Sequence, residues 1–277
     1  MRFTKAHGLG NDFILVEAGD APGDAAPWAR RLCDRHEGVG GDGVLVYAAA
    51  PDGVQMRLIN ADGGEAEISG NGVRCLAAFA FRKGWAKPSH LVHTAAGARA
   101  VEVVPLLGRT RFRVSTDLGP PRLGSEEIPV ALDPPRAAVI AHPLEVGGRT
   151  VKVTAVSFGN PHCAVLGEEP VDDATIAVLG PALEAHPLFP RRTNVEFVSV
   201  TRRDEVRARF WERGVGLTRA SGTGAASAAV AAMLLGRADR RVRVRCDGGV
   251  LDVEWPEGGS VIQVGEVEIV FEGDWLA

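Results

Sequence analysis

The sequence predicts an α+β fold of two pseudo-symmetric lobes, each a curved, mostly antiparallel sheet around one central helix. The first observation is a repeated stretch, from Asn60 to Gly84 and again from Glu212 to Gly236. Each copy holds a Ser-Gly-x-Gly turn, an apolar run of about three helical turns and a closing glycine, which is typical of a buried helix. Short strand-like segments bounded by glycine or proline surround both copies. An internal duplication would place Ser69 and Ser221 across one cleft from each other.

Composition excludes several classes of protein. The chain has 277 residues, of which 45% are hydrophobic and 24% are charged, as in a soluble globular protein. The net charge of -4 and the pI near 6.0 give no basic surface for nucleic acid or an anionic membrane. No apolar run approaches the ~20 residues of a membrane span, and the first residues resemble a strand rather than a signal peptide. The four cysteines lack CxxC spacing, so we expect neither a zinc site nor disulfides, and a cytoplasmic location.

In the first lobe, alternating apolar residues predict the strands, and Pro27 marks the first turn of an early helix. Residues 38–43 are rich in glycine and are expected to form a flexible loop. The predicted strands cover residues 2–6, 13–18, 44–47, 55–60, 90–94, 98–104 and 110–115, and the predicted helices cover residues 27–35 and 73–81. Proline and glycine accumulate from residue 118 to 135, which indicates the lobe boundary. We therefore assign residues 1–117 to an N-terminal lobe.

The second lobe, residues 118–266, repeats the same pattern. Its predicted strands cover residues 150–157, 194–200, 206–211, 241–245, 250–255 and 260–264, and its helices cover residues 176–184 and 225–235. A last strand at residues 268–271, within the segment 267–277, is expected to return to the N-terminal lobe.

Polar residues next to predicted strand and helix ends are the candidate site residues, because convergent polar groups in a cleft form small-molecule sites. Two facing helix N-termini would add a site for an anion. Each residue also has a structural interpretation. Ser69 and Ser221 occupy N-cap positions, for which serine is well suited. Asn71 and Thr223 could form turns, His162 could be a turn histidine, and Glu212 with Arg213 could be a surface ion pair.

Seven motifs, in order along nearly the whole chain, resemble those of the diaminopimelate epimerase family. The motifs are His7-Gly8-Leu9-Gly10-Asn11-Asp12-Phe13, Asn60-Ala61-Asp62-Gly63, Ser69-Gly70-Asn71-Gly72-Val73-Arg74-Cys75, Gly159-Asn160-Pro161-His162-Cys163, Arg192-Thr193-Asn194, Trp211-Glu212-Arg213-Gly214 and Ser221-Gly222-Thr223-Gly224-Ala225. One such motif alone is weak evidence, but seven in the family's order are specific.

The resemblance implies an enzyme that interconverts LL- and meso-diaminopimelate without a cofactor, on the route to lysine and peptidoglycan. It implies a small diamino diacid substrate clamped between two helix N-termini, with acid/base groups at the positions of Ser69 and Ser221 on opposite faces of Cα. His162 would lie close to the first of these groups. The resemblance also implies residues that hold the amino and carboxylate groups: Asn11, Asn60, Asn160, Asn194, Glu212 and Arg213. Backbone N–H groups at Gly70, Asn71, Gly222 and Thr223 would bind the α-carboxylate.

The same resemblance implies a homodimer that associates through the N-terminal lobe. Pyridoxal phosphate is not expected, because no lysine lies in a predicted cleft motif where it could form a Schiff base. No metal, nucleic acid or membrane is expected either.

The chain departs from the family at the catalytic pair, which is Cys and Cys in the family and Ser69 and Ser221 here. A hydroxyl ionises roughly 7 pH units above a thiol, which corresponds to about 10 kcal/mol. Cys75 and Cys163, which match the family, are retained. Leu217 and Gly43 also depart, since glutamate and glutamine are common there.

Three explanations of the serine pair remain open. The chain could catalyse a related isomerisation with Glu212 or His162 as a single base. It could bind an amino acid without turnover. Alternatively, the serines could be deliberate replacements that freeze a reactive site.

Overall fold

The computed structural model describes residues 1–106 and 108–276. The chain divides into two compact units, which are Met1–Asp117 with Val264–Ala277 (unit 1) and Leu118–Gln263 (unit 2). Each unit combines helices with a mostly antiparallel sheet, and this confirms the predicted α+β class. No helix in the described part of the chain is long and apolar enough to cross a membrane.

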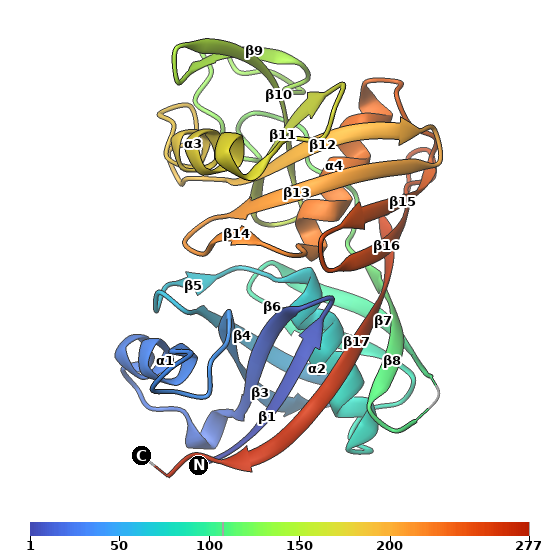
Figure 1. Ribbon diagram of the computed structural model, residues 1–277. Helices are drawn as coiled ribbons and strands as arrows, with labels where there is room; N and C mark the ends of the chain where they lie inside the picture. The colour runs from blue at the N-terminus through green and yellow to red at the C-terminus, as the bar shows by residue number, and fades with distance from the viewer. Residues whose placement is uncertain (107, 277) are drawn as a thin grey trace. The chain divides into compact units, whose positions relative to one another are not determined.

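The strands of unit 1 close into a barrel around helix α2 (Gly70–Arg82), as Figure 1 shows. The strands, in the order in which they pair, are β1 (Arg2–Gly8), β2 (Asn11–Glu17), β3 (Gly43–Ala50), β4 (Gly53–Asn60), β6 (Ser89–Thr94), β7 (Gly97–Pro105), β8 (Arg111–Asp117) and β17 (Ile262–Asp274), which pairs with β1. A short strand, β5 (Glu65–Ala66), adds to β4. The two chain ends meet here, since the backbones of Met1 and Trp275 hydrogen-bond to each other.

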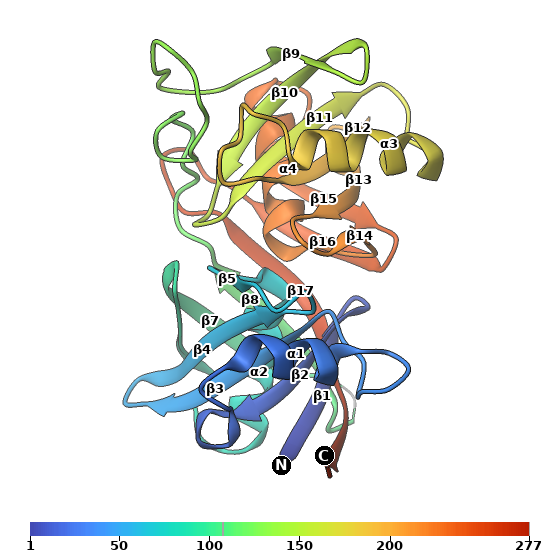
Figure 2. The same ribbon diagram turned by 90° about the vertical axis from the view of Figure 1, so that its left-hand side faces the viewer.

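Helix α1 (Ala25–Cys33) covers the outer face of this sheet, as Figure 2 shows. Phe13 and Leu15 pack with the residues of α2, whereas Ile14 and Val16 pack with α1. Strand β2 is therefore apolar on both faces, as a strand covered on both sides must be.

Unit 2 is built in the same way around helix α4 (Gly222–Leu234). Its strands are β9 (His142–Val146), β10 (Arg149–Ser157), β11 (Pro161–Gly167), β12 (Asn194–Arg202), β13 (Glu205–Glu212), β14 (Gly216–Thr218), β15 (Arg241–Cys246) and β16 (Gly249–Glu254). Helix α3 (Asp173–Glu184) packs against an apolar cluster from β9 to β13.

The topology of the two units repeats. Pairings along β1–β2–β3–β4–β6–β7 alternate between antiparallel and parallel, and pairings along β10–β11–β12–β13–β15–β16 alternate in the same order. Helix α1 follows β2 as α3 follows β11, and α2 follows β5 as α4 follows β14. The repeated topology accounts for the repeated sequence pattern.

Several details of the predicted elements were wrong. The predicted strands 260–264 and 268–271 form one continuous strand, β17, which runs through Gly265. Strands β5, β9, β11 and β14 were not predicted. In β11 the reason is Pro161, which is tolerated as the first residue of a strand, where a missing N–H does least harm.

Candidate active site

Ser69 and Ser221 are the N-caps of the two central helices. Each has extended backbone, with φ -128° and ψ 123° at Ser69 and φ -126° and ψ 129° at Ser221. Ser69 Oγ accepts a hydrogen bond from Gly72 N at 3.1 Å, and Ser221 Oγ accepts one from Gly224 N at 3.3 Å. The helices therefore begin three residues earlier than the sequence predicted, because the Ser-Gly-x-Gly segment is the cap and first turn rather than a turn before the helix.

The second glycine of each motif makes room for the cap. A Cβ atom on Gly224 would lie 2.8 Å from both Cβ and Oγ of Ser221, and one on Gly72 would lie 3.2 Å from Ser69 Cβ. The first turn of an α-helix also carries N–H groups that no carbonyl of the helix accepts. At Gly70 and Gly222 this turn is buried, and each helix N-terminus, taken by itself, is suited to an anion.

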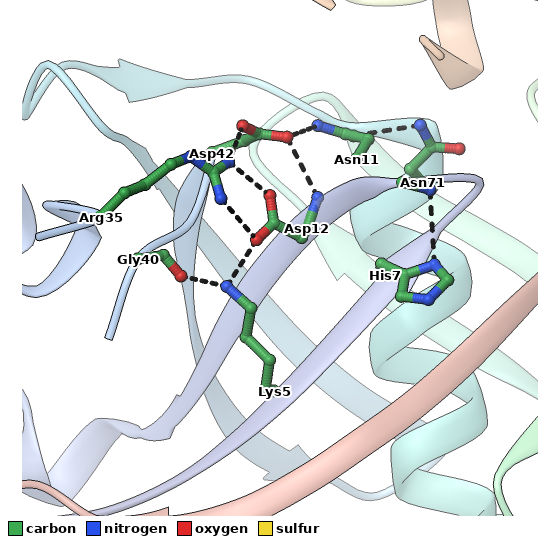
Figure 3. Close-up of polar contacts among 9 residues, drawn as sticks. Lys5, His7, Asn11, Asp12, Arg35, Gly40, Asp42 and Asn71 are labelled. Atoms are coloured by element: carbon green, nitrogen blue, oxygen red, sulfur yellow. Dashed lines mark hydrogen bonds and ion pairs between the residues drawn. The ribbon is translucent and has the colours of Figure 1, made fainter. Parts of the chain in front are cut away.

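In unit 1, two buried asparagines lie in one line of hydrogen bonds, which Figure 3 shows in part. Asn71 Nδ2 donates to Asn11 Oδ1 at 3.0 Å, and Asn11 Nδ2 donates to Asp42 Oδ2 at 2.7 Å. Arg74, which is fully buried in α2, donates to Asn71 Oδ1. Sequence reasoning identified Asn11 and Asn71 but missed Arg74 and Asp42.

Four charged residues support this line. Arg35 donates to both carboxylate oxygens of Asp12, at 2.7 and 3.2 Å, and to Asp42 Oδ1 at 2.8 Å. Lys5 Nζ lies 2.5 Å from Asp12 Oδ2 and donates to the carbonyl of Gly40. Burial would raise the pKa of Asp12, but the hydrogen bonds from Arg35 and Lys5 outweigh burial and lower it. Burial and the charge of Asp12 raise the pKa of Asp42.

Asn60 ends strand β4, opposite Gly43 on β3. Its backbone closes a turn with Gly63 and Gly64, which leaves its half-buried side chain at the strand end. A Cβ atom on Gly43 would lie 2.9 Å from the carbonyl oxygen of Ile59. This backbone would have to shift to accept a side chain at position 43.

In unit 2, His162 is fully buried and both of its ring nitrogens are engaged. Nδ1 lies 2.7 Å from Glu196 Oε1, and Nε2 lies 3.1 Å from Asn160 Oδ1. Asn160 Nδ2 in turn donates to Thr223 Oγ1 on the first turn of α4, at 3.2 Å. The structure thus joins three predicted site residues, and it adds Glu196, which the sequence reasoning missed.

The turn after β13 carries Glu212 and Arg213, and two polar side chains hold it. Asn194 Oδ1 accepts from Arg213 N at 3.0 Å, and Asn194 Nδ2 donates to the Pro161 carbonyl at 3.0 Å. Glu184, a buried residue that sequence reasoning also missed, has three partners: Trp211 Nε1 at 2.8 Å, Gly214 N at 2.9 Å and Arg192 Nη2 at 2.5 Å.

The four cysteines are free and buried, and none occupies a cap position. Burial raises the pKa of Cys33 and Cys75 to about 12. Burial also raises the pKa of Cys163 and Cys246. Such thiols behave as small apolar groups, so none can supply the thiolate that the serine positions lack.

A fold of two similar units, each with a sheet around one central helix, is shared by solved structures that include epimerases. A predicted epimerase from Pseudomonas aeruginosa has a TM-score of 0.71 at 19% identity, covering 100% of this chain and 99% of that one. A hydroxyproline epimerase from Agrobacterium vitis, with bound trans-4-hydroxy-L-proline, has a TM-score of 0.72 at 16% identity, covering 99% and 91%. At these identities the likeness concerns the fold alone.

Sequence comparison identifies the family within this class. The profile described as diaminopimelate epimerase matches residues 3–123 and 154–270. The diaminopimelate epimerase of Desulforudis audaxviator (strain MP104C) is 49% identical over 281 residues, covering 100% of this chain and 99% of that protein. The chain belongs to the diaminopimelate epimerase family.

Proposed function

We propose that this chain binds diaminopimelate and is built to interconvert its LL and meso forms without a cofactor, with slow turnover because both acid/base positions are serine. The observation that carries the proposal is the 49% identity to a diaminopimelate epimerase over the whole chain, together with the matched serine caps.

In this proposal one group removes the Cα proton and the other delivers a proton to the opposite face. Removing the proton moves negative charge onto the α-carboxylate. The first-turn N–H groups at Gly70, Asn71, Gly222 and Thr223 would stabilise that charge, as helix N-termini do for developing anions.

The serines make the proton transfer slow. Their Oγ atoms accept the N–H groups of Gly72 and Gly224, which favours an ionised oxygen, but the same bonds and helix dipole would favour a thiolate at that place. The difference of roughly 7 pH units between hydroxyl and thiol therefore remains. An alkoxide is a stronger base once formed, so only part of this difference reaches the rate, and we expect a turnover about 10³- to 10⁴-fold slower than with two thiols.

The remaining predicted site residues take the following roles. Glu212 and His162 assist proton transfer, and His162 acts beside Asn160, with which it shares a hydrogen bond. Asn11, Asn60, Asn160, Asn194, Glu212 and Arg213 hold the amino and carboxylate groups, for which neutral amides and a guanidinium fork are suited. We also propose a homodimer in the cytoplasm, which light scattering of the purified protein and cell fractionation would test.

Proton NMR of LL- and meso-diaminopimelate in D2O tests the function. The variant carrying Ser69→Cys and Ser221→Cys is expected to exchange the Cα proton rapidly and to interconvert the isomers, whereas the parent does so slowly. Fast exchange by the parent, abolished by Glu212→Gln, would instead establish a single-base reaction. No exchange by either protein, with no heat of binding in calorimetry, would overturn the proposal.

A further inference from the structure

We propose that Asp42 is a positioning residue: its carboxylate fixes the amide orientation of Asn11, so that Asn11 meets a carboxylate of the bound amino acid as a hydrogen-bond donor. The inference rests on the proposed function for the identity of the ligand. Its structural part, the locked amide, stands on contacts within unit 1 alone.

The orientation of both amides follows from the two ends of the line, of which Figure 3 shows the Asp42 end. Arg74 at one end can only donate, so the oxygen of Asn71 faces it. The Nδ2 group of Asn71 then donates to Asn11 Oδ1 at 3.0 Å, and Asn11 Nδ2 is left to face Asp42 Oδ2 at 2.7 Å. An ionised carboxylate can only accept, so this end agrees with the other. A donor-only group and an acceptor-only group therefore allow one arrangement of the amides between them.

The consequence for Asn11 is a fixed polarity. Its carbonyl oxygen accepts from Asn71, and one Nδ2 hydrogen is directed at Asp42. The second Nδ2 hydrogen is the group that Asn11 can offer to a ligand, and a carboxylate oxygen is the partner that such a donor favours over an ammonium group.

Asp42 is itself held from several sides. Its Oδ1 accepts from Arg35 at 2.8 Å, and its Oδ2 also accepts from Asp12 N at 3.0 Å. Asp42 N donates to the Asp12 carbonyl at 2.8 Å. Because Arg35 also forms two hydrogen bonds with Asp12, the guanidinium group joins the two carboxylates and fixes their separation.

The glycine-rich loop before Asp42 is shaped to bring it there. Gly40 has φ +79°, and its carbonyl accepts from Lys5. A Cβ atom on Gly38 would lie 2.2 Å from the Arg31 carbonyl oxygen, so no other residue fits at the end of α1. Loop N–H groups bond to the carbonyls of Leu32 and other α1 residues. The loop that was expected to be flexible is therefore hydrogen-bonded to the end of α1.

The hold of Asp42 on the Asn11 amide should depend on pH. The charged groups that face Asp42 are Arg35 and Asp12; Lys5 pairs with Asp12, and the charge of Asp42 acts on the buried Cys33 thiol. Burial and Asp12 raise the pKa of Asp42, so it takes up a proton at a higher pH than an ordinary aspartate. The protonated acid no longer requires a donor from Asn11, which releases the amide.

The test observes the Asn11 side-chain NH2 signals in ¹⁵N-labelled protein without ligand, assigned by their loss in Asn11→Asp. We expect these signals to titrate with Asp42 in the parent and to lose that titration in Asp42→Asn, while Asp204→Asn, a surface control in unit 2, changes nothing. In the double-thiol variant, Asp42→Asn should raise KM for diaminopimelate about tenfold with a smaller change in kcat. Arg35→Lys keeps the Asp42 carboxylate, so its KM should lie between the values with Asp42 intact and with Asp42→Asn.

Two results would overturn the proposal. Unchanged Asn11 signals in Asp42→Asn would show that the amide is not held by this carboxylate. Altered signals with an unchanged KM would show that the held amide does not serve the ligand. Because the NMR measurement needs no substrate, failure of the proposed function would appear separately, as absence of exchange in the double-thiol variant with Asp42 intact. If Asp42→Asn does not fold, Arg35→Gln decides the question: without the guanidinium the same titration should move to higher pH, and an unmoved titration would overturn the proposal.

Discussion

Ser69 and Ser221 have the same backbone conformation to within 6° and the same hydrogen bond, one in each unit: φ -128° and -126°, ψ 123° and 129°, with Oγ accepting the N–H of the glycine three residues later. Each hydroxyl therefore caps a helix while keeping its own proton to donate. Capping and proton transfer are compatible roles for one side chain, so the two interpretations of these serines do not exclude each other.

The cap predicts a cost in stability. Ser69→Ala and Ser221→Ala should each lower the free energy of unfolding by about 0.5–2 kcal/mol, whereas glycine at the same positions should cost only a few tenths. Urea unfolding of the four variants measures both effects. Equal losses for alanine and glycine would contradict the capping role.

Thiol labelling tests the inertness of the cysteines. Because burial raises the pKa of Cys33 and Cys75 to about 12 and raises that of Cys163 and Cys246, a disulfide reagent at pH 8 should label the folded parent slowly. In the unfolded protein all four thiols should react rapidly. The double-thiol variant should gain one fast-reacting thiol at the partly exposed position 69, whereas the thiol at the buried position 221 should react more slowly. Fast labelling of the folded parent would show that a native thiolate exists.

Some site residues could be predicted from the sequence and others could not, depending on whether their partners are close in the chain. Ser69 and Asn160 lie in short motifs, and the neighbouring residues of each motif are enough to predict a turn or a helix cap. The glycines that end the two central helices could be predicted for the same reason. Gly84 and Gly236 do have positive φ, +73° and +68°. Glu184 could not be assigned, because its partners Trp211 and Gly214 lie about 30 residues away in the chain.

Two of the missed residues did leave a signal. Glu196 interrupts an apolar strand and Arg74 interrupts an apolar helix, and both are buried, with 1% and 0% of their surface exposed. A charge at a core position of a predicted element requires a buried partner. That rule could have identified both residues before the structure was known.

The charged cluster of unit 1 predicts a pH dependence. The pKa of Asp12 is lowered, since Arg35 and Lys5 outweigh burial, so its contribution to stability is present above the ordinary value of 3.8 and is lost as the pH falls through the lower, folded-state value. The difference in unfolding free energy between parent and Asp12→Asn should therefore shrink below about pH 3.8. Urea unfolding from pH 2 to 6 measures it, and a constant difference across this range would contradict the ion pairs.

Glu184 predicts a graded effect on ligand binding. Glu184→Ala removes an acceptor from Trp211 Nε1 and Gly214 N, so the turn that carries Glu212 should loosen. Leaving these N–H donors without their acceptor costs about 1–3 kcal/mol of stability, since the charged partner Arg192 is half exposed. Glu184→Gln keeps one acceptor oxygen and should lose less stability than Glu184→Ala. Calorimetric titration with diaminopimelate should rank affinity as parent, Gln, then Ala, and equal affinities would remove Glu184 from the site.

The two-base account is tested most directly by the rate of Cα proton exchange in D2O for Ser69→Cys, Ser221→Cys, the double variant and the parent, with each isomer of diaminopimelate. One thiol leaves the opposite face of Cα to a hydroxyl, so the account predicts that interconversion recovers strongly only when both thiols are present. Full recovery with one thiol, or a parent as fast as the double variant, would contradict it.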